Sequence, residues 1–417
     1  MTFNGWKEVV LEEVSYYGDE KIPSAEVTLD NYISTENMLP NKSGVGMASG
    51  LPTTKSVRRY KKGDILLSNI RPYFKKIWFA TKNGGCSNDV LVIKNKDEKE
   101  LDKKYLYYTL LQDNFFDYVT ATSKGTKMPR GDKSAIMNYG IMLPPLNEQK
   151  AIASILSAFD EKIETNNQIN EKLEEMAQAL FKHWFVDFEF PNENGKPYKS
   201  SGGEMVESEL GMIPKGWEVK TINDISSEII TGKTPSTKEK ENFGGNIPFV
   251  KIPDMHGKVY VEKTETYLSE KGAVKNKIVP KNSIMVSCIA TPGIVSLAGQ
   301  SCQTNQQINT IINKDNKMCY FNFFSLRNLS DTIRTLGSSG SATLNLNKNQ
   351  FSKIKIVVPP KEMTDKYFNV VDKIFETIYL NQKENLKLIE LRDTLLPKLM
   401  SGEIRVPLDI ETLAEQS

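Results

Sequence analysis

The fold is decided by the stretch LPPLNEQKAIASILSAFDEKIETNNQINEKLEEMAQALFKHWFVDFEF, residues 143–190. After its two prolines, apolar residues recur at spacings of three and four, which is typical of a helix that buries one seam against another helix. The seam consists of Ile152, Leu156, Phe159, Ile163, Leu173, Ala177, Leu180 and Trp184. The pattern predicts a long helix within 147–190, and its first 39 residues would span roughly 60 Å at 1.5 Å per residue.

A second copy of this stretch lies 215 positions further along the chain. Val358-Pro359-Pro360 matches Leu143-Pro144-Pro145 at that offset. The positions that match the first seam are Tyr367, Val371, Ile374, Ile378, Leu388, Arg392, Leu395 and Leu399, and all but Arg392 are apolar. The second half of the chain is therefore predicted to close with its own long helix, over 361–402.

Both seams are interrupted by asparagine at the same offset, at Asn166 and Asn170 in the first and at Asn381 and Asn385 in the second. A seam asparagine reduces stability but penalises wrong registers, because an unpaired amide in an apolar interface is unfavourable. We predict that these four residues pair between two antiparallel helices, which would relate the halves by an approximate two-fold axis. The alternative is that they are polar residues on solvated helix middles.

The repeat extends beyond the helices. Gly5-Trp6, followed by Leu11 and Val14, matches Gly216-Trp217, followed by Ile222 and Ile225. The segment GDILLSNI, which ends at Ile70, matches NSIMVSCI, which ends at Ile289, and each is predicted to form a short strand after a turn. Such a repeat indicates one structural unit written twice.

Domain boundaries follow from the repeat and from composition. We predict a first globular domain over 1–146, the central helix over 147–190, a connector over 191–214, a second globular domain over 215–360, the distal helix over 361–402 and a tail over 403–417. The connector is rich in Gly, Ser, Pro and charged residues and is predicted to be exposed.

Bulk composition narrows the class of protein. An apolar content of 39% predicts folded domains, and no run approaches the roughly 18 apolar residues of a membrane span. The N-terminus lacks the pattern of a signal peptide, so we expect a cytoplasmic location. The four scattered cysteines, Cys86, Cys288, Cys302 and Cys319, indicate neither a disulfide framework nor a zinc site.

The sequence does not match the common motifs of catalytic sites. Gly232-Lys233-Thr234 resembles the end of a phosphate-binding loop, but position 227 is Ser where that loop requires Gly. The two histidines, His183 and His256, have no partners at the spacing of a catalytic triad or metal cluster. We therefore predict no catalytic residue and no metal site in this chain.

Nucleic-acid contact is predicted from local charge, because the net charge of +2 does not by itself indicate it. Residues 55–76 hold many cations interleaved with aromatic residues, and 123–133 form a second basic loop, which suits phosphate neutralisation. The candidates are Arg58, Arg59, Arg71, Lys75, Lys76, Lys124, Thr126, Lys127 and Arg130. The alternative is a solvated basic sheet edge and a flexible connection.

In the second half, the loop at 338–349 matches the basic loop of the first half but is rich in small and amide residues, which suit close approach to base edges. Its candidates are Ser339, Ser341, Thr343 and Asn345, with Lys275 and Lys277 as candidate backbone contacts. The two loops differ in chemistry at matched places, as expected if each half reads a different short sequence.

Four segments in order resemble the specificity subunits of Type I restriction-modification enzymes, and the resemblance covers essentially the whole chain. They are LPPLNEQKAIASIL at 143–156, ALFKHWFVDFEF at 179–190, ESELGMIPKGWEV at 207–219 and LRDTLLPKLMSGEIRV at 391–406. One departure is Lys361-Glu362-Met363 after the second Pro-Pro, where the first copy has Leu-Asn-Glu-Gln.

The resemblance implies two target recognition domains of mixed α/β (α+β) type, spaced by two long antiparallel coiled-coil helices. It implies recognition of a two-part asymmetric site in duplex DNA, with the gap set by the helices. It also implies two methylation subunits and restriction subunits as partners, which would bring S-adenosylmethionine, ATP and Mg²⁺ and direct adenine methylation and cleavage. No cofactor and no membrane contact are then expected for this chain itself.

Two other functions stay open at this point. The chain could be a coiled-coil scaffold that binds proteins, with its basic patches merely solvated. It could also be a stand-alone nuclease or methyltransferase, although the absent motifs argue against this. Salt dependence of DNA binding separates the scaffold from a DNA reader, because phosphate contacts give steep salt slopes.

Overall fold

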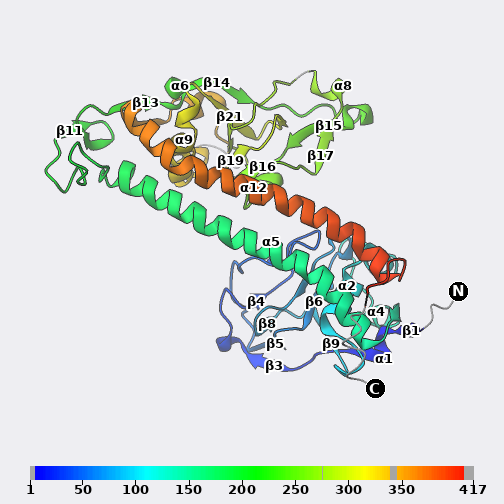
Figure 1. Cartoon of the computed structure of the whole chain (residues 1–417). Helices are drawn as coiled ribbons and strands as arrows, with labels where there is room; N and C mark the ends of the chain where they lie inside the picture. The colour runs from blue at the N-terminus through cyan, green and yellow to red at the C-terminus, as the bar shows by residue number, and fades with distance from the viewer. Residues whose placement is uncertain (1–4, 275, 339–344, 408–417) are drawn as a thin grey trace. The chain divides into compact units, whose positions relative to one another are not determined.

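The computed structural model describes residues 5–274, 276–338 and 345–407 (Figure 1). The chain forms two compact units that are not consecutive in sequence. The first comprises residues 1–163 and 387–417, and the second comprises residues 164–386. The boundaries fall inside the two long helices, α5 (Leu146–Phe181) and α12 (Lys361–Met400), so each unit includes a segment of both.

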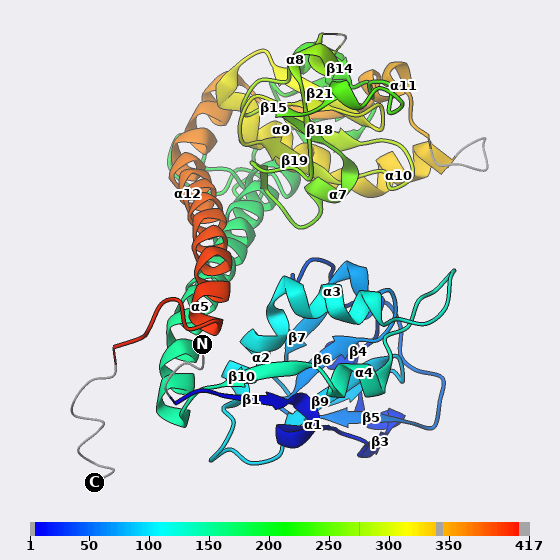
Figure 2. The ribbon, with the colours of Figure 1, turned by 90° about the vertical axis from the view of Figure 1, so that its right-hand side faces the viewer.

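The first unit is built on two four-stranded sheets and one strand pair. The first sheet has the order β2 (Ser15–Tyr17), β9 (Val90–Asn95), β6 (Ile65–Ser68), β7 (Ile77–Phe79). The second has the order β3 (Lys21–Pro23), β5 (Ser56–Tyr60), β8 (Gly84–Cys86), β4 (Tyr32–Ile33). The pair joins β1 (Lys7–Val10) to β10 (Gly140–Leu143), which run side by side in Figure 2.

Short helices complete this unit. They are α1 (Leu11–Val14), α2 (Lys103–Leu111), α3 (Asp113–Ala121) and α4 (Lys133–Met137), with 3-10 turns at Ser24–Glu26 and Pro72–Phe74. Asp102 and Asp132 are the N-caps of α2 and α4. Their carboxylates accept hydrogen bonds from backbone N–H groups of the first turn, which have no partner within the helix. The core of this unit joins α2, α3, β6 and β9 to Ile152 and Leu156 of α5 and Leu399 of α12.

The second unit repeats the plan with a larger sheet. Its five strands have the order β14 (Ser226–Thr231), β21 (Ile308–Asn313), β18 (Ile284–Ser287), β19 (Val295–Ala298), β16 (Tyr260–Val261). A three-stranded sheet follows the order β17 (Thr266–Leu268), β15 (Phe243–Val250), β20 (Gln303–Thr304), and β13 (Glu218–Thr221) pairs with β22 (Lys355–Val358). The short helices are α6 (Ile222–Ile225), α7 (Ile252–Met255), α8 (Glu270–Ala273), α9 (Cys319–Asn328), α10 (Ser330–Ser338) and α11 (Lys348–Ser352), with 3-10 turns at Lys240–Asn242 and Asn316–Met318.

The predicted repeat is present in the backbone. The strand and short helix that open the first unit, β1 and α1, recur as β13 and α6. The strand within GDILLSNI is β6, and its counterpart within NSIMVSCI is β18. The elements before each Pro-Pro, α4 with β10 and α11 with β22, stand at the offset of 215. The predicted fold class, two α/β units with two long helices, is confirmed.

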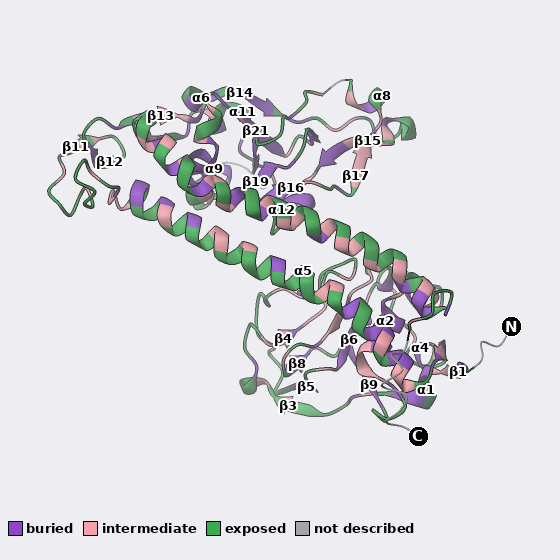
Figure 3. Ribbon diagram, viewed as in Figure 1, coloured by how far each residue is buried: buried purple, intermediate pink, exposed green. Residues whose placement is uncertain are grey.

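The helices run antiparallel where they meet inside the second unit. Asn166 contacts Asn385, whereas Tyr367 donates its hydroxyl to the carbonyl of Ala177 at 3.1 Å, so residue numbers rise along α5 as they fall along α12. In the first unit, Asp160 pairs with Arg392, which stands in the second seam where the first has Ala177. Figure 3 shows buried positions recurring along both helices between exposed ones, as the heptad pattern predicts.

The central helix ends earlier than the predicted 190. After Phe181 the chain forms one π-helical turn, Lys182–Val186, and Phe188 then adopts a positive φ of 61°. The wider turn lets Trp184 and Phe185 pack beside Tyr367 and Phe321, with a ring separation of 5.0 Å between Phe185 and Tyr367. Aromatic packing therefore outweighs regular helix continuation here.

The segment 191–214, predicted to be an exposed connector, is largely exposed, but it also contains ordered structure. It carries the hairpin of β11 (Met205–Ser208) and β12 (Gly211–Pro214), and Ile213 is buried. The ring of Phe190 stacks between Tyr198 and Trp217, at 4.5 and 5.2 Å. Stacking on Trp217 ties this segment to the second unit.

Candidate nucleic-acid interface

The basic loop of the first unit is anchored at the end of strand β6. Asn69, directly after β6, donates its backbone N–H to the carbonyl of Asp89 at 2.8 Å, and its own carbonyl accepts from Gly131 at 3.0 Å. Ile70 forms a β-bridge with Arg130. Three loops, 69–71, 87–89 and 124–131, therefore meet at one strand end.

The second unit builds the same junction at the end of β18. Cys288 donates to the carbonyl of Gln307 at 2.8 Å and accepts from Leu346 at 2.9 Å. Ile289 forms a β-bridge with Asn345. Arg130 and Asn345, which are 215 positions apart, thus occupy matched places on matched scaffolds, so the frame is repeated while the side chains differ.

A left-handed residue follows each of these strand ends. Arg71 has φ of 49° and Ala290 has φ of 65°, a conformation that non-glycine residues rarely adopt. The Arg71 N–H donates to the carbonyl of Pro129 at 2.8 Å, which fixes the exposed arginine beside the basic loop. Local strain of this kind persists only where surrounding contacts determine the backbone.

Five predicted cation or hydroxyl residues lie together at the first junction and are exposed: Arg71, Lys124, Thr126, Lys127 and Arg130. Lys124 and Arg130 bond each other's backbones across the loop, at 2.8 and 2.9 Å. Their side chains form ion pairs with Asp132 at 2.5 Å and Asp89 at 3.3 Å. The hydrogen bond from Lys124 holds the pKa of the Asp132 carboxyl below its ordinary value.

Other predicted cations are engaged within the unit. The Arg58 guanidinium donates to the carbonyl of Val90 at 2.6 Å, and the Lys76 ammonium donates to the carbonyl of Thr35 at 2.6 Å. Lys75 pairs with Asp113 at 2.7 Å, and exposed Arg59 lies 3.9 Å from Glu20. These contacts hold Arg58 and Lys76 within the unit, and burial lowers the pKa of Lys76.

Only some of the predicted DNA-contact residues of the second unit lie within the described residues. Lys275, Ser339, Ser341 and Thr343 lie outside the described residues. Asn345 is exposed at the junction, whereas Lys277 forms an ion pair with Glu228 on β14. The structure therefore places one of the predicted base-contacting residues at the junction and gives Lys277 a partner in its own sheet.

Sequence reasoning missed the turns that complete each junction, Ser87-Asn88-Asp89 and Asn305-Gln306-Gln307. It also set aside Gly232-Lys233-Thr234, whose backbone lies against the second turn: the Lys233 N–H donates to the carbonyl of Thr304 at 3.1 Å. A Cβ on Gly232 would stand 2.1 Å from that carbonyl oxygen, so this position requires glycine. The glycine is explained by close packing, with no need for a phosphate loop.

The four predicted seam asparagines form a hydrogen-bonded ladder. The Asn166 amide donates to Asn385 Oδ1 at 2.9 Å and to Glu384 Oε2 at 2.7 Å. Asn385 donates to Asn167 at 2.9 Å, and Asn381 donates to Asn170 at 2.9 Å. Asn166 is 1% exposed, so its amide depends on these partners.

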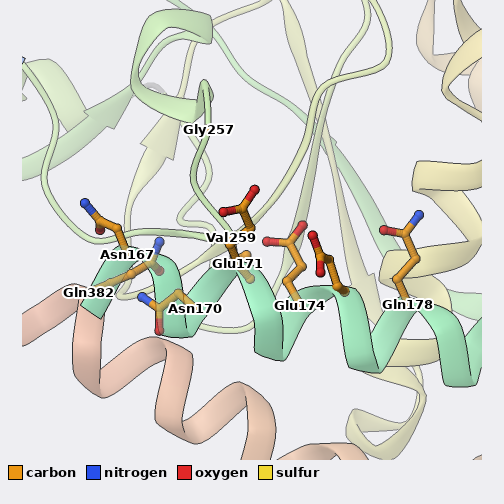
Figure 4. A pocket seen from close by; sticks show the side chains of 9 residues that line it. Asn167, Asn170, Glu171, Glu174, Gln178, Gly257, Val259 and Gln382 are labelled. Atoms are coloured by element: carbon orange, nitrogen blue, oxygen red, sulfur yellow. The ribbon is translucent and has the colours of Figure 1, made fainter. Parts of the chain in front are cut away.

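A polar hollow of about 560 Å³ lies beside this ladder in the second unit (Figure 4). Asn167, Glu171, Glu174 and Gln178 project from α5 toward the loop that carries Gly257 and Val259. Glu174 forms an ion pair with Arg327, while Glu171 and Glu175 add further negative charge. Its negative charge has the same sign as a phosphate backbone and repels it, which distinguishes this hollow from the loop junctions.

The described part of the chain contains no group of three His, Cys, Asp or Glu side chains placed to hold a metal ion. No described helix is long and apolar enough to cross a membrane. All four cysteines are buried and unpaired with one another. Among the described residues, the repeated loop junction is therefore the best candidate for a binding surface.

Comparison with known proteins gives consistent matches across most of the chain. The family model for the Type I restriction modification DNA specificity domain matches residues 4–175 and again 214–390. The Type I restriction enzyme HindI specificity subunit of Haemophilus influenzae is 34% identical, over 96% of this chain and 99% of that protein. The MjaIX specificity subunit of Methanocaldococcus jannaschii is 30% identical, over 84% of this chain and 80% of that protein.

Among solved structures, the S subunit of a Type I restriction-modification system from M. genitalium is similar in fold, with a TM-score of 0.55 at 18% identity. The match covers 96% of this chain and 98% of that one. The two family matches fall on the two copies of the repeat. This chain therefore belongs to the family of Type I restriction-modification DNA specificity subunits.

Proposed function

We propose that this chain recognises a two-part, asymmetric sequence in duplex DNA and directs a Type I restriction-modification complex to it. One observation carries the proposal: the junction of Ile70 with Arg130 recurs as the junction of Ile289 with Asn345, with different side chains on the same frame. A repeated frame with divergent loops is suited to reading two different half-sites. Family membership supports the DNA as ligand.

In this proposal the chain binds DNA and partners but performs no chemistry. Two methylation subunits would supply S-adenosylmethionine-dependent adenine methylation, and restriction subunits would supply ATP- and Mg²⁺-dependent cleavage. The complex would act in the cytoplasm. The acidic hollow on α5 is available for a partner protein because its glutamates disfavour DNA.

Sequencing of methylated DNA tests the proposal. Cells that express the chain with its methylation subunit should show adenine methylation at one motif made of two short half-sites and a fixed gap. Cells that express the methylation subunit alone are the control. A continuous motif, or no motif, would contradict the proposal.

The basic loop gives a second test. Replacing Lys124, Lys127 and Arg130 together by Ala should weaken duplex binding, because exposed cations at the junction neutralise phosphates. The matched control replaces three exposed lysines of the same unit outside the loops, Lys7, Lys21 and Lys99. Equal binding by the two triple variants would remove the loop from the interface.

The spacer role is tested through the helices. Inserting one helical turn after Asn170 should lengthen the gap between half-sites and leave both half-sites unchanged. The same insertion placed after Ser208, in the tight β11–β12 turn, should leave the gap as it is. An unchanged gap in the helix variant would refute the spacer role.

Two alternatives make different predictions. A protein-binding scaffold would be retained on duplex DNA weakly and without a steep salt slope. A stand-alone nuclease or methyltransferase would turn over substrate as the purified chain, with Mg²⁺ or a methyl donor.

A further inference from the structure

We propose that two turns missed by sequence reasoning, 87–89 in the first unit and 305–307 in the second, are base-reading elements, one for each half-site. Each turn ends at a junction and exposes amide or carboxylate side chains. The inference rests on the proposed function and deepens it, because it names which residues determine specificity.

The two turns are equivalent parts of the repeat. The first connects β8 to β9 and the second connects β20 to β21. Ser87 donates to the carbonyl of Ile33 at 2.9 Å, and Asn305 donates to that of Val250 at 3.1 Å. Each turn then closes on itself, because the N–H of Val90 or Ile308 bonds the carbonyl three residues earlier.

The first turn, 87–89, is fixed by a hydrogen bond and by close packing of the strand before it. The Arg58 guanidinium, predicted from sequence to contact DNA, donates to the carbonyl of Val90 at the end of this turn. Gly85, in the strand before it, packs so closely that a Cβ would stand 2.4 Å from the Val57 side chain. A rigid turn loses little conformational freedom on binding, which favours specific contacts.

The second turn is braced by its own side chains. Asn305 Oδ1 accepts the Gln307 N–H at 3.1 Å, and its amide donates to Gln307 Oε1 at 2.9 Å. Gln306 at the tip is exposed and accepts a bond from Thr234. The exposed neighbour Lys233 adds a cation beside this turn.

The side chains at the tips have the chemistry of base readers. Asn88 and Gln306 are exposed at matched positions, while the flanking Val90 and Ile308 are fully buried. Asn and Gln can bond both edge groups of adenine, and Asp can accept from the exocyclic amine of cytosine. Different residues on the same frame account for different half-sites.

The carboxylate of Asp89 would repel DNA phosphates if it were unpaired. Arg130 Nη2 lies 3.3 Å from Asp89 Oδ1 and offsets that charge. The same turn forms one wall of a hollow of about 520 Å³ whose other walls include Ser34, Thr35 and Glu36. A base edge placed here meets acceptors that suit an exocyclic amine.

The test compares methylated motifs of variant complexes. Asn88→Ala and Asp89→Asn should relax one half-site, so that sites differing there at one base pair become methylated with discrimination reduced roughly 5-fold to 150-fold. Gln306→Ala and Gln307→Ala should relax only the other half-site. Asn138→Ala and Asn223→Ala, exposed asparagines elsewhere in the two units, should keep the original motif.

The possible outcomes separate this inference from the proposed function. A two-part motif with the unaltered chain but unchanged motifs in all four turn variants overturns the inference alone. Relaxation of both half-sites by one turn also overturns it, because each turn is assigned to a single half-site. The conservative variants Asn88→Gln and Gln306→Asn keep an amide, so that loss of folding does not explain their effect. A base preference that shifts at one position in these variants supports the assignment.

Discussion

At the scale of single residues, buried polar groups carry the most information. The seam asparagines are costly in an apolar interface, yet each finds an amide or carboxylate partner within the second unit. Trp6 donates its indole N–H to buried Glu148 at 2.9 Å, and Arg405 pairs with the same carboxylate at 3.1 Å. The counterpart of Glu148 is Met363, and Trp217 is packed among aromatic rings instead.

Replacing Asn385 by Ala should destabilise the chain by about 1–3 kcal/mol, because the buried Asn166 amide loses a partner. The urea midpoint of the full chain measures the effect. Gln168→Ala is the control, since this exposed residue on α5 bonds only Glu164 one turn away and should shift the midpoint little. Equal midpoints for the two variants would show that the ladder adds no stability.

The thiols predict a dependence on pH. Burial raises the pKa of Cys288 to about 11 and those of Cys86, Cys302 and Cys319 to about 12, above the ordinary value of 9.0. Their contribution to stability is complete below pH 9 and is lost as the pH rises toward 11–12. We expect no reaction of the native chain with a thiol reagent at pH 8, four thiols after denaturation, and a urea midpoint that falls above pH 9. Rapid labelling of the native chain would contradict burial.

At the scale of elements, the helices were predicted well because their periodicity is local. Where tertiary packing intervened, the prediction was less accurate: α5 ends at Phe181 because a π-helical turn brings Trp184 and Phe185 into the aromatic core. At Lys361-Glu362-Met363, where the second copy departs from the first, α12 nevertheless begins at Lys361. Thr364, matched to Gln149, is buried there and bonds the Lys361 carbonyl.

Arg392 is the charged residue among the matched positions of the second seam and offers a test at this scale. Its guanidinium bonds Asp160 at 2.5 Å and Asp393 at 2.8 Å, and Tyr108 donates to Asp160 at 2.6 Å. Arg392→Ala should lower the free energy of unfolding by roughly 1–2 kcal/mol, because Asp160 keeps only the tyrosine and partial solvation. Arg392→Lys keeps the charge and should recover part of the loss. Calorimetry on both variants decides, and an unchanged melting temperature for Arg392→Ala would refute this role.

At the scale of the whole molecule, the local distribution of charge explains how a nearly neutral chain can bind a polyanion. The net charge is only +2, so the cations must be concentrated where they act. They gather at the junction of the first unit, while the hollow on α5 concentrates glutamates. Local distribution, rather than total charge, is what the proposed function requires.

The dependence of duplex binding on salt measures that distribution. If Lys124 and Lys127 each neutralise one phosphate, Lys124→Ala with Lys127→Ala should reduce the slope of log K against log salt by about 2. Lys7→Ala with Lys99→Ala should leave the slope as it is. A slope that does not change in the first variant would show that these lysines face solvent in the complex.

The sequence by itself determined the repeat, the two long helices and their asparagine positions, because periodicity and matched offsets are local properties of the chain. It also indicated the basic loop at 124–130 as a DNA contact, which stays a prediction. Only the tertiary structure showed that Arg58 and Lys76 are engaged inside the unit and that the turns 87–89 and 305–307 meet the loops at the ends of β6 and β18. These arrangements depend on strand pairing between distant segments, and hydrogen-bond partners of that kind leave no spacing in the sequence to read.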